Sequence, residues 1–302
     1  MQPLVSVIIP THNHAQFLSE AIESVLAQSY LNIELIVVND GSADHTKEVV
    51  KRYGSKLIYI YQRNRGLSAA RNTGIKASRG GFLAFLDADD IWLPSKIEDQ
   101  MKAIVNLKSV GLITCGNYQI NEEGGIKSQI VREKHPNKAD LTKNLLFKNF
   151  VSGGSNALVR RECFEKVGLF DEKLRSAEDW DMWFRINKYY EIKCVNKPLV
   201  KVRVVSNSMC SPLNVEKMLY NELLVLNRVF SDEQFKRKAL AKRKAYGQRY
   251  FCAAWACKES REISKFKKYL FQSFLLYPFA FFRKSYLALV LYAISKNVNI
   301  KN

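Results

Sequence analysis

Short apolar runs alternate with helical patterns along the first third of the chain. The runs cover residues 4–9, 34–38, 57–61 and 82–86. A helix is expected after each run. Apolar residues recur at helical spacing over 17–26, a polar helix is expected over 44–53, a helix of small residues over 67–77 and a further helix over 94–107. Strands that alternate with helices form a mostly parallel sheet with helices on both faces. The sequence therefore predicts an α/β fold.

The pattern changes after residue 107. Two strand-like runs, 112–120 and 126–131, flank a turn of hairpin type at 121–125. Helices are expected at 141–148 and 179–190, a strand at 156–159, and an extended stretch at 193–205.

Basic charge is concentrated at the carboxyl end. The 302 residues carry a net charge of +18, and residues 213–302 hold 18 Lys and Arg against 6 Asp and Glu, or +12. We therefore expect a division near Pro212, into an α/β domain of residues 1–212 and a basic helical region of residues 213–302.

The cysteines and the amino terminus indicate a cytoplasmic protein. None of the six cysteines forms a Cys-x-x-Cys pair, so zinc and redox motifs are not indicated. The first residues lead directly into a strand pattern without the basic and apolar segments of a signal peptide.

Polar residues follow the carboxyl ends of all four early strands. In open α/β sheets ligands bind beyond these ends. Four strand ends with polar groups therefore favour a ligand site at one edge of the sheet. The residues are Pro10, Thr11, His12, Asn13, Asn39, Asp40, Asn64, Arg65, Gly66, Asp87, Ala88 and Asp89.

Three carboxylates, Asp87, Asp89 and Asp90, follow the fourth apolar run. Unpaired charges at the end of a buried strand are costly, so a cation is expected beside them. Mg²⁺ or Mn²⁺ suits oxygen ligands and commonly accompanies phosphates. The alternative is an acidic turn before a helix that starts at Pro94.

The site lacks the common nucleotide motifs. Neither a Gly-x-Gly-x-x-Gly after the first strand nor a phosphate loop is present. A nucleoside diphosphate held through a metal fits better. Asp40 could accept a hydrogen bond from a ring nitrogen of the base, and Arg71 could contact the base or a phosphate. Asn64 and Gly66 could allow the backbone to approach the nucleotide closely. The alternatives are a turn role for Asp40 and a solvated helix position for Arg71.

A second acidic group lies at Glu178 and Asp179, beside Trp180 and Trp183. A carboxylate near a helix amino end is stabilised as an anion, which suits a general base. An indole could stack on a sugar, although core packing is expected for Trp183. The alternative for the acids is helix capping.

Taken in order, these segments resemble family 2 glycosyltransferases. The resemblance covers about residues 3–205. It is carried by 5–13 (VSVIIPTHN), 38–42 (VNDGS), 64–72 (NRGLSAARN), 85–90 (FLDADD), Ser155-Asn156, 168–171 (GLFD) and Glu178-Asp179.

The resemblance implies a GT-A fold, a nucleotide-sugar donor and inversion at the anomeric carbon. It implies that Asp40 contacts the base, commonly uracil. It also implies that Asp89 binds Mg²⁺ or Mn²⁺, with Asp87 on the metal or the ribose. Asp179 would then deprotonate the acceptor hydroxyl. Other residues are then expected at the donor nucleotide, and two on the acceptor side. The donor residues are Pro10, Thr11, Asn13, Asn64, Gly66, Arg71, Ala88 and Arg203; the acceptor residues are Glu178 and Trp180.

Two positions depart from the family pattern. His12 replaces a frequent Tyr, and Asn39 stands where many relatives have Asp. Both substitutions leave the base preference open.

The carboxyl-terminal region combines basic clusters with aromatic residues. Residues 236–238 and 242–244 are basic and are expected in one long helix, while 274–282 and 286–294 are apolar. These runs are too short to span a bilayer but suit an interfacial helix on anionic lipid. Such a protein would be peripheral on the inner face of the membrane. With the family resemblance, this makes a lipid-linked or cell-envelope glycan the expected acceptor.

Three other interpretations of this region and of the protein remain open. The apolar runs could instead complete a core. The protein could bind nucleic acid through its basic clusters, although no nucleic-acid motif supports this and the acidic edge opposes it. It could also be a catalytically inactive sugar-nucleotide binder.

Overall fold

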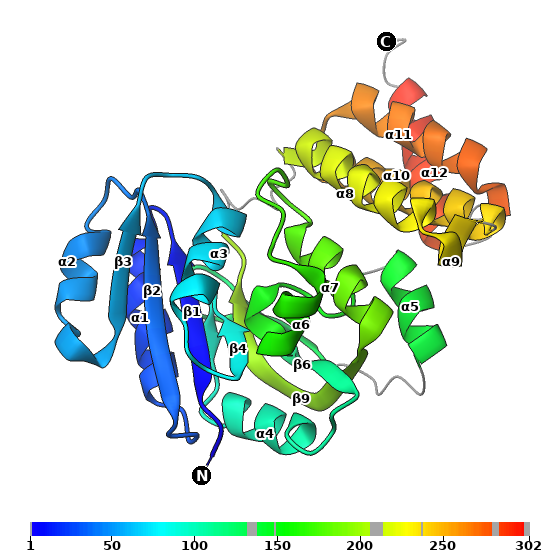
Figure 1. Ribbon diagram of the computed structural model, residues 1–302. Helices are drawn as coiled ribbons and strands as arrows, with labels where there is room; N and C mark the ends of the chain where they lie inside the picture. Colours follow the sequence, from blue (N-terminus) through cyan, green and yellow to red (C-terminus); the bar gives the residue numbers. More distant parts are fainter. Residues whose placement is uncertain are drawn as a thin grey trace. The chain divides into compact units, whose positions relative to one another are not determined.

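The computed structural model describes residues 2–131, 138–147, 149–205, 214–236, 238–279 and 284–298. The chain forms two compact units, Met1–Val205 and Ser206–Asn302 (Figure 1). Pro212, the boundary expected from the charge distribution, lies outside the described residues.

The first unit is built on one mixed sheet. Its spatial order is β3-β2-β1-β4-β8-β6-β9-β5, and β7 pairs with β6. The strands are β1 (Val5–Thr11), β2 (Ile33–Asp40), β3 (Ile58–Gln62), β4 (Phe82–Phe85), β5 (Ile91–Trp92), β6 (Val110–Ile120), β7 (Ile126–Ile130), β8 (Leu158–Arg160) and β9 (Glu191–Arg203).

The first four strands are parallel, as the alternating pattern predicts. The rest of the sheet is mixed. There β6 runs parallel to β9, whereas β4–β8, β6–β8, β6–β7 and β5–β9 are antiparallel. The short turn between β6 and β7 joins antiparallel neighbours, because a parallel pair needs a much longer crossover.

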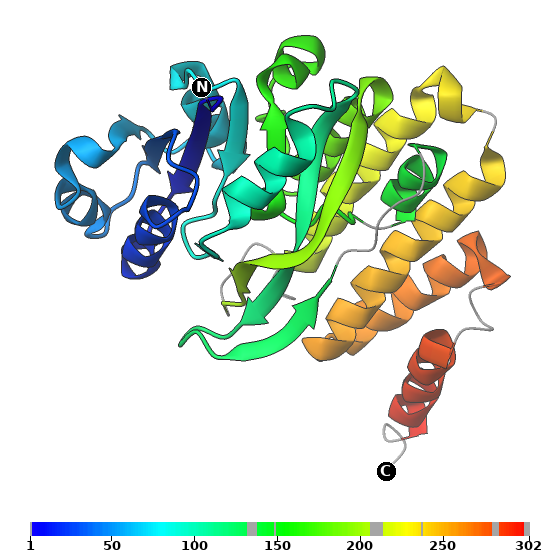
Figure 2. The same cartoon turned by 90° about the horizontal axis from the view of Figure 1, so that it is seen from below.

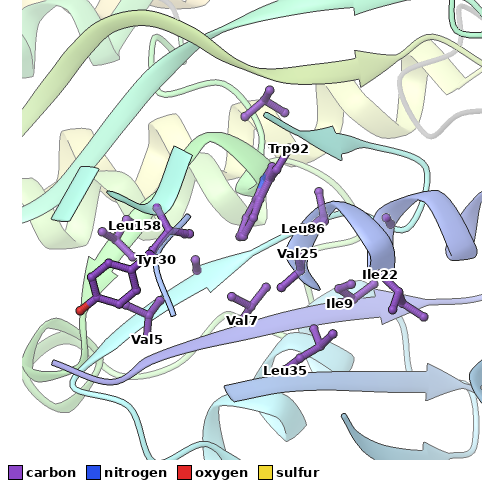
Figure 3. Close-up of a cluster of buried hydrophobic side chains, with 14 of the residues drawn as sticks. Val5, Val7, Ile9, Ile22, Val25, Tyr30, Leu35, Leu86, Trp92 and Leu158 are labelled. Carbon is purple, nitrogen blue, oxygen red and sulfur yellow. The ribbon is translucent and has the colours of Figure 1, made fainter. Parts of the chain in front are cut away.

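Helices cover both faces of this sheet. They are α1 (Ala15–Leu26), α2 (Thr46–Lys51), α3 (Leu67–Ala77), α4 (Lys96–Ile104), α5 (Lys138–Phe147), α6 (Arg161–Val167) and α7 (Glu178–Tyr189). The first is amphipathic, and its Ile22 and Val25 pack with the β1 side chains of Val5, Val7 and Ile9 (Figure 3). Full burial of such a side chain contributes about 1.5–3 kcal/mol.

On the opposite face α3 approaches β1 closely. A Cβ atom added to Gly74 would lie 2.4 Å from Cγ2 of Ile8, so a larger residue would push the helix away from the sheet.

Strand register brings the polar strand ends to one edge. Thr11 lies opposite Asn39, and Asp40 lies opposite Gln62. Ile8 lies opposite Phe85, so the acidic residues after β4 emerge near the level of Pro10. The expected site edge is therefore formed by the fold.

The second unit is helical. It contains α8 (Val215–Ser231), α9 (Glu233–Lys236), α10 (Ala239–Glu259), α11 (Ile263–Leu276) and α12 (Lys284–Val298). Its core includes Leu219, Ala254, Phe266, Tyr286 and Leu289. Figure 2 shows these helices from a second direction. Within the described ranges, no helix has the length and apolarity needed to cross a membrane.

The expectation of one long helix through residues 236–244 is wrong. Helix α9 ends at Lys236 and α10 begins at Ala239, while Arg237 lies outside the described residues. The short α9 buries Phe235 against Phe230, with ring centroids 6.1 Å apart. A break after Phe230 allows this contact. Residues 280–282 of the apolar run expected at 274–282 also lie outside the described part.

Candidate active site

Asp40 fixes the loop that leads into α3. Its Oδ1 accepts hydrogen bonds from Gln62 Nε2 at 2.7 Å and the Arg65 amide at 2.9 Å, and its Oδ2 accepts from the Gly66 amide at 2.8 Å. Gly66 has φ +93°, and a Cβ atom there would lie 2.2 Å from Arg175 Nη1. A carboxylate has about four acceptor positions, so one remains for a ligand donor.

The end of β1 carries a buried, unpartnered hydroxyl. Thr11 is 3% exposed, and its Oγ1 has no hydrogen-bond partner among the residues that the structure describes. A buried polar atom of this kind is costly unless something pairs with it. The Thr11 hydroxyl is therefore suited to a hydrogen bond with a polar ligand. Pro10, the preceding residue, is buried.

Asn13 and Asn64 join neighbouring loops at the same edge. Asn13 is in the left-handed region, with φ +56°. Its amide donates to Ser42 Oγ at 3.0 Å, and its Oδ1 accepts from the Ala43 amide at 2.8 Å. Asn64 is exposed, and its side-chain nitrogen lies 3.1 Å from His12 Nε2.

The acidic loop, residues 87–90, contains one structural carboxylate, Asp90, and two half-buried carboxylates, Asp87 and Asp89. Asp90 is buried and accepts from Ser155 Oγ at 2.6 Å and from the Arg203 amide at 3.0 Å. Burial, followed by the charge of Asp87, raises the pKa of Asp89. Ala88 is 2% exposed and lies in the core, so a ligand could meet only its backbone.

The donor set of Asp87 and Asp89 fits a hard divalent cation. The negative charge of each carboxylate increases the free-energy cost of ionising the other. Carboxylate oxygens are the ligands that Mg²⁺ and Mn²⁺ prefer. Within the described ranges, no group of three or more His, Cys, Asp or Glu is arranged to hold a metal. The protein thus suits a metal that takes its other ligands from water and phosphate.

Arg203 supports the acidic loop. Its Nε donates to the Asp89 carbonyl at 3.0 Å, its Nη2 pairs with Glu20 at 3.0 Å, and its guanidinium lies 4.6 Å from the Phe17 ring centroid. The side chain is 1% exposed. The hydrogen-bond donors of Arg203 therefore bind protein groups that surround the acidic loop. A contact between Arg203 and a diphosphate stays a prediction.

Arg71 connects the acidic loop to α7. Its Nη2 lies 2.8 Å from Asp87 Oδ1, and its Nη1 lies 2.7 Å from Glu178 Oε1. Burial alone would lower the pKa of Arg71, but the charges of Asp87 and Glu178 outweigh it and raise the pKa. The sequence suggests a nucleotide contact or a solvated position. The structure instead gives this residue a buried bridging role.

Asp179 lies in the first turn of α7. The helix starts after Ala177, which has φ +59°. Asp179 Oδ1 accepts from the Trp180 amide at 2.6 Å, and Oδ2 accepts from Asn149 Nδ2 at 3.0 Å. Burial, followed by the charge of Glu178, raises the pKa of Asp179 to about 7, against the opposing effects of Arg71 and Asn149. A carboxyl group with this pKa can exchange a proton near neutral pH.

No local sequence signal indicates a functional role for Asn149. It stands 30 positions before Asp179 and belongs to no recognised motif. Only the folded arrangement brings the two together.

The two residues expected on the acceptor side are both buried. Glu178 is 5% exposed and pairs with Arg71, and Trp180 is 2% exposed with its indole N–H donating to the Leu145 carbonyl at 2.9 Å. This packing does not support stacking of a sugar on Trp180. Core packing of Trp183 is confirmed.

Known proteins resemble the chain in sequence. Residues 6–168, more than half of the chain, match the family described as glycosyl transferase family 2. An uncharacterized glycosyltransferase of Rickettsia prowazekii is 37% identical over 205 residues, covering 67% of this chain and 64% of that protein. The chain therefore spans less than two thirds of that relative's length.

A second relative has a more specific name. The UDP-Glc:alpha-D-GlcNAc-diphosphoundecaprenol beta-1,3-glucosyltransferase WfgD of Escherichia coli is 34% identical over 212 residues. The match covers 69% of this chain and 80% of that protein.

Solved structures share the fold. S. aureus TarS 1-349 in complex with UDP-GlcNAc has a TM-score of 0.63 at 18% identity, covering 89% of this chain and 81% of that one. The mannosyltransferase PcManGT from Pyrobaculum calidifontis, in complex with GDP-Man and Mn²⁺, has a TM-score of 0.59 at 18% identity, covering 100% and 89%. The fold is that of the GT-A glycosyltransferases. By its sequence match, the chain belongs to glycosyl transferase family 2.

Proposed function

We propose that the protein is an inverting glycosyltransferase that moves a sugar from a nucleoside diphosphate to an acceptor hydroxyl. The observation that carries this proposal is the link through Arg71. One buried cation pairs with Asp87 of the acidic loop and with Glu178, the neighbour of a carboxyl group whose pKa is about 7. A single side chain thus connects the candidate metal-binding segment with the residue next to the candidate base.

The reaction assigns different tasks to the two acidic groups. Asp89, with Asp87, would hold Mg²⁺ or Mn²⁺, and a bound metal neutralises charge on a departing diphosphate. Asp179 takes the proton from the acceptor hydroxyl while the oxygen of that hydroxyl forms a bond to the anomeric carbon. The bond from that carbon to the diphosphate oxygen breaks, so the configuration inverts. General-base help of this kind contributes about 10²–10⁴-fold.

The strand ends would hold the nucleotide. Asp40 keeps one acceptor position for a base N–H, and the Thr11 hydroxyl lacks a partner in the described part of the chain. Uracil is the proposed base, because WfgD is named for UDP-Glc and TarS was solved with UDP-GlcNAc. The remaining donor contacts are proposed for Pro10, Asn13, Asn64, Gly66, Ala88 and Arg203.

The acceptor is proposed to be a lipid-linked glycan. WfgD is named for a diphosphoundecaprenol-linked acceptor. The carboxyl-terminal region carries +12 over its last 90 residues, which would attract it to anionic lipid. The proposed location is the cytoplasmic side of the membrane.

A ligand panel tests this function. UDP-Glc, UDP-GlcNAc and GDP-Man would be compared by thermal shift with and without Mn²⁺, and the best donor would then be titrated calorimetrically. A donor at 100 times its Kd stabilises a protein by about 2.7 kcal/mol. We expect at least one UDP-sugar to stabilise the protein in a Mn²⁺-dependent manner, and Asp89→Ala to weaken that binding.

Glu48→Ala is the matched control, because Glu48 is exposed on α2, away from the acidic loop. Its binding should equal that of the wild type. Equal donor affinity with and without Mn²⁺ would remove the metal from the proposal. Absence of binding to all three donors would contradict the function itself.

A further inference from the structure

Helix α11 has an apolar face that its own unit does not cover. Phe266, Leu270 and Ser273 point into the helical core. On the other side, Phe271 is 62% exposed, Leu275 is 55% exposed and Phe274 is 41% exposed. Scattered exposed apolar residues are ordinary, but three large ones on one turn and a half of a helix indicate an interaction surface.

Further exposed apolar residues follow α11 in the chain. Phe279, shortly after the helix, is 65% exposed. Helix α12 exposes Leu287 and Leu291, which are four residues apart and so lie on one side of that helix.

The same face of α11 is basic toward its amino end. Lys268 is exposed and Lys267 is half-exposed. The 40 residues from Ile263 to the carboxyl terminus contain seven Lys and Arg and no Asp or Glu. Glu262, the residue at the N-cap position of α11, is paired with Lys265 at 2.7 Å. The surface beside the exposed apolar rings therefore carries a net positive charge.

This combination selects among possible partners. A second copy would place Lys268 in the field of another basic segment, which is repulsive. Nucleic acid would pair with the lysines but would leave Leu275 and its aromatic neighbours in water. An anionic bilayer offers phosphates to the lysines and an apolar medium to the rings at once.

We propose that α11 docks on an anionic lipid surface, lying in the plane of the interface. Phe271, Phe274 and Leu275 enter the acyl boundary, while Lys268 contacts headgroup phosphates. At 14 residues the helix is about 21 Å long, which is enough to lie along a surface and too short to cross it. The purpose of this docking rests on the proposed function, whereas the docking itself does not.

The test is co-sedimentation of the full chain with vesicles of phosphatidylcholine alone or with 30% phosphatidylglycerol. The wild type should bind the anionic vesicles at least tenfold more tightly, and the difference should shrink with added salt. Leu275→Glu should weaken binding to anionic vesicles about tenfold or more, because it removes an inserted side chain and adds a repelled charge. Lys268→Gln should weaken it about fivefold, because it removes one headgroup contact.

Matched controls separate this surface from general charge and hydrophobicity. Leu31→Glu changes an 86% exposed leucine of the first unit, and Lys47→Gln changes an exposed lysine of α2. Both should bind vesicles like the wild type. Donor turnover in solution should be unchanged in Leu275→Glu, so a failed docking test is distinguishable from a failed function.

Three results would overturn the inference. One is equal binding of the wild type and Leu275→Glu to anionic vesicles. Another is equal wild-type binding to neutral and anionic vesicles. The third is a wild-type dimer, seen by light scattering, that Leu275→Glu converts to a monomer, since the face would then serve a second copy.

Discussion

Asn149 Nδ2 lies 3.0 Å from Asp179 Oδ2, so a side-chain amide holds the candidate base from outside its own helix. The contact favours the ionised carboxylate and acts against the burial that raises the pKa of Asp179. Under the proposed function, Asn149 is therefore a positioning residue that also keeps Asp179 ready to accept a proton.

Replacing Asn149 should make transfer more sensitive to acid. In Asn149→Ala the pKa of Asp179 rises further, so less of the base is ionised on the acid side. A hydrogen bond to a charged group contributes about 1.5 kcal/mol or more, which predicts about tenfold slower transfer at pH 6.5. At pH 9 the rate should stay within about twofold of the wild type. A kcat/KM profile measures both, with Asn106→Ala, an exposed site, as control. An equal loss at both pH values would indicate a purely structural role.

Removing the base should separate chemistry from binding. Asp179→Asn keeps the shape of the side chain but cannot take a proton, so kcat should fall about 10²–10⁴-fold. Donor affinity, measured by calorimetry, should remain within about twofold. Transfer at the wild-type rate would rule out Asp179 as the base.

Breaking the Arg71 bridge should destabilise the first unit. Arg71→Gln leaves Asp87 and Glu178 without their cation, and removing one partner of a buried pair costs about 3–5 kcal/mol. Because Asp87 is partly exposed and can be hydrated, we expect about 3 kcal/mol. Urea unfolding followed by tryptophan fluorescence measures this change. Lys102→Gln, which breaks the exposed pair with Glu98, should leave stability nearly unchanged, and an equal effect of both variants would contradict the bridging role.

A buried lysine should make stability rise with pH. Lys96 is fully buried, with its amine 3.7 Å from the Trp92 ring centroid, and burial lowers its pKa to about 7. An unfolded lysine stays protonated to about pH 10.4, so between these values the unfolded state binds more protons. The free energy of unfolding should therefore increase by about 2 kcal/mol from pH 7 to 9.

The variant Lys96→Met should lose this rise and be more stable than the wild type at pH 7. Denaturant titrations at the two pH values measure both effects. Lys102→Met changes an exposed lysine of the same helix and should keep the wild-type dependence. A wild type with a flat pH dependence would mean that the amine is solvated.

The strand ends were predictable because period and polarity are local properties of the sequence. Thr11, Asp40 and Asp87 each follow a short apolar run, and parallel pairing brings such positions to one edge. The order of the motifs along the chain was likewise sufficient to predict the family. The mixed half of the sheet was harder to predict, because β8 pairs with β4 and β9 pairs with β6 through contacts between residues distant in sequence.

The partners of the site residues could not be read from the sequence. Nothing local indicates that Arg71 reaches Glu178, 107 positions away, or that Arg203 donates to the carbonyl of Asp89. Trp180 looked suited to a sugar because it neighbours Asp179. Successive helical residues point in different directions, however, and Trp180 turns into the core.

The half-buried pair Asp87 and Asp89 has a consequence for the order of encounter. A nucleoside diphosphate is itself an anion, and at this edge it would meet carboxylates of its own sign. The overall charge of +18 draws such a molecule toward the protein from a distance, while the last few ångströms repel it. Under the proposed function, only a nucleotide already neutralised by its cation passes this local barrier. The acidic loop would thereby discriminate against free nucleotides before any sugar is recognised.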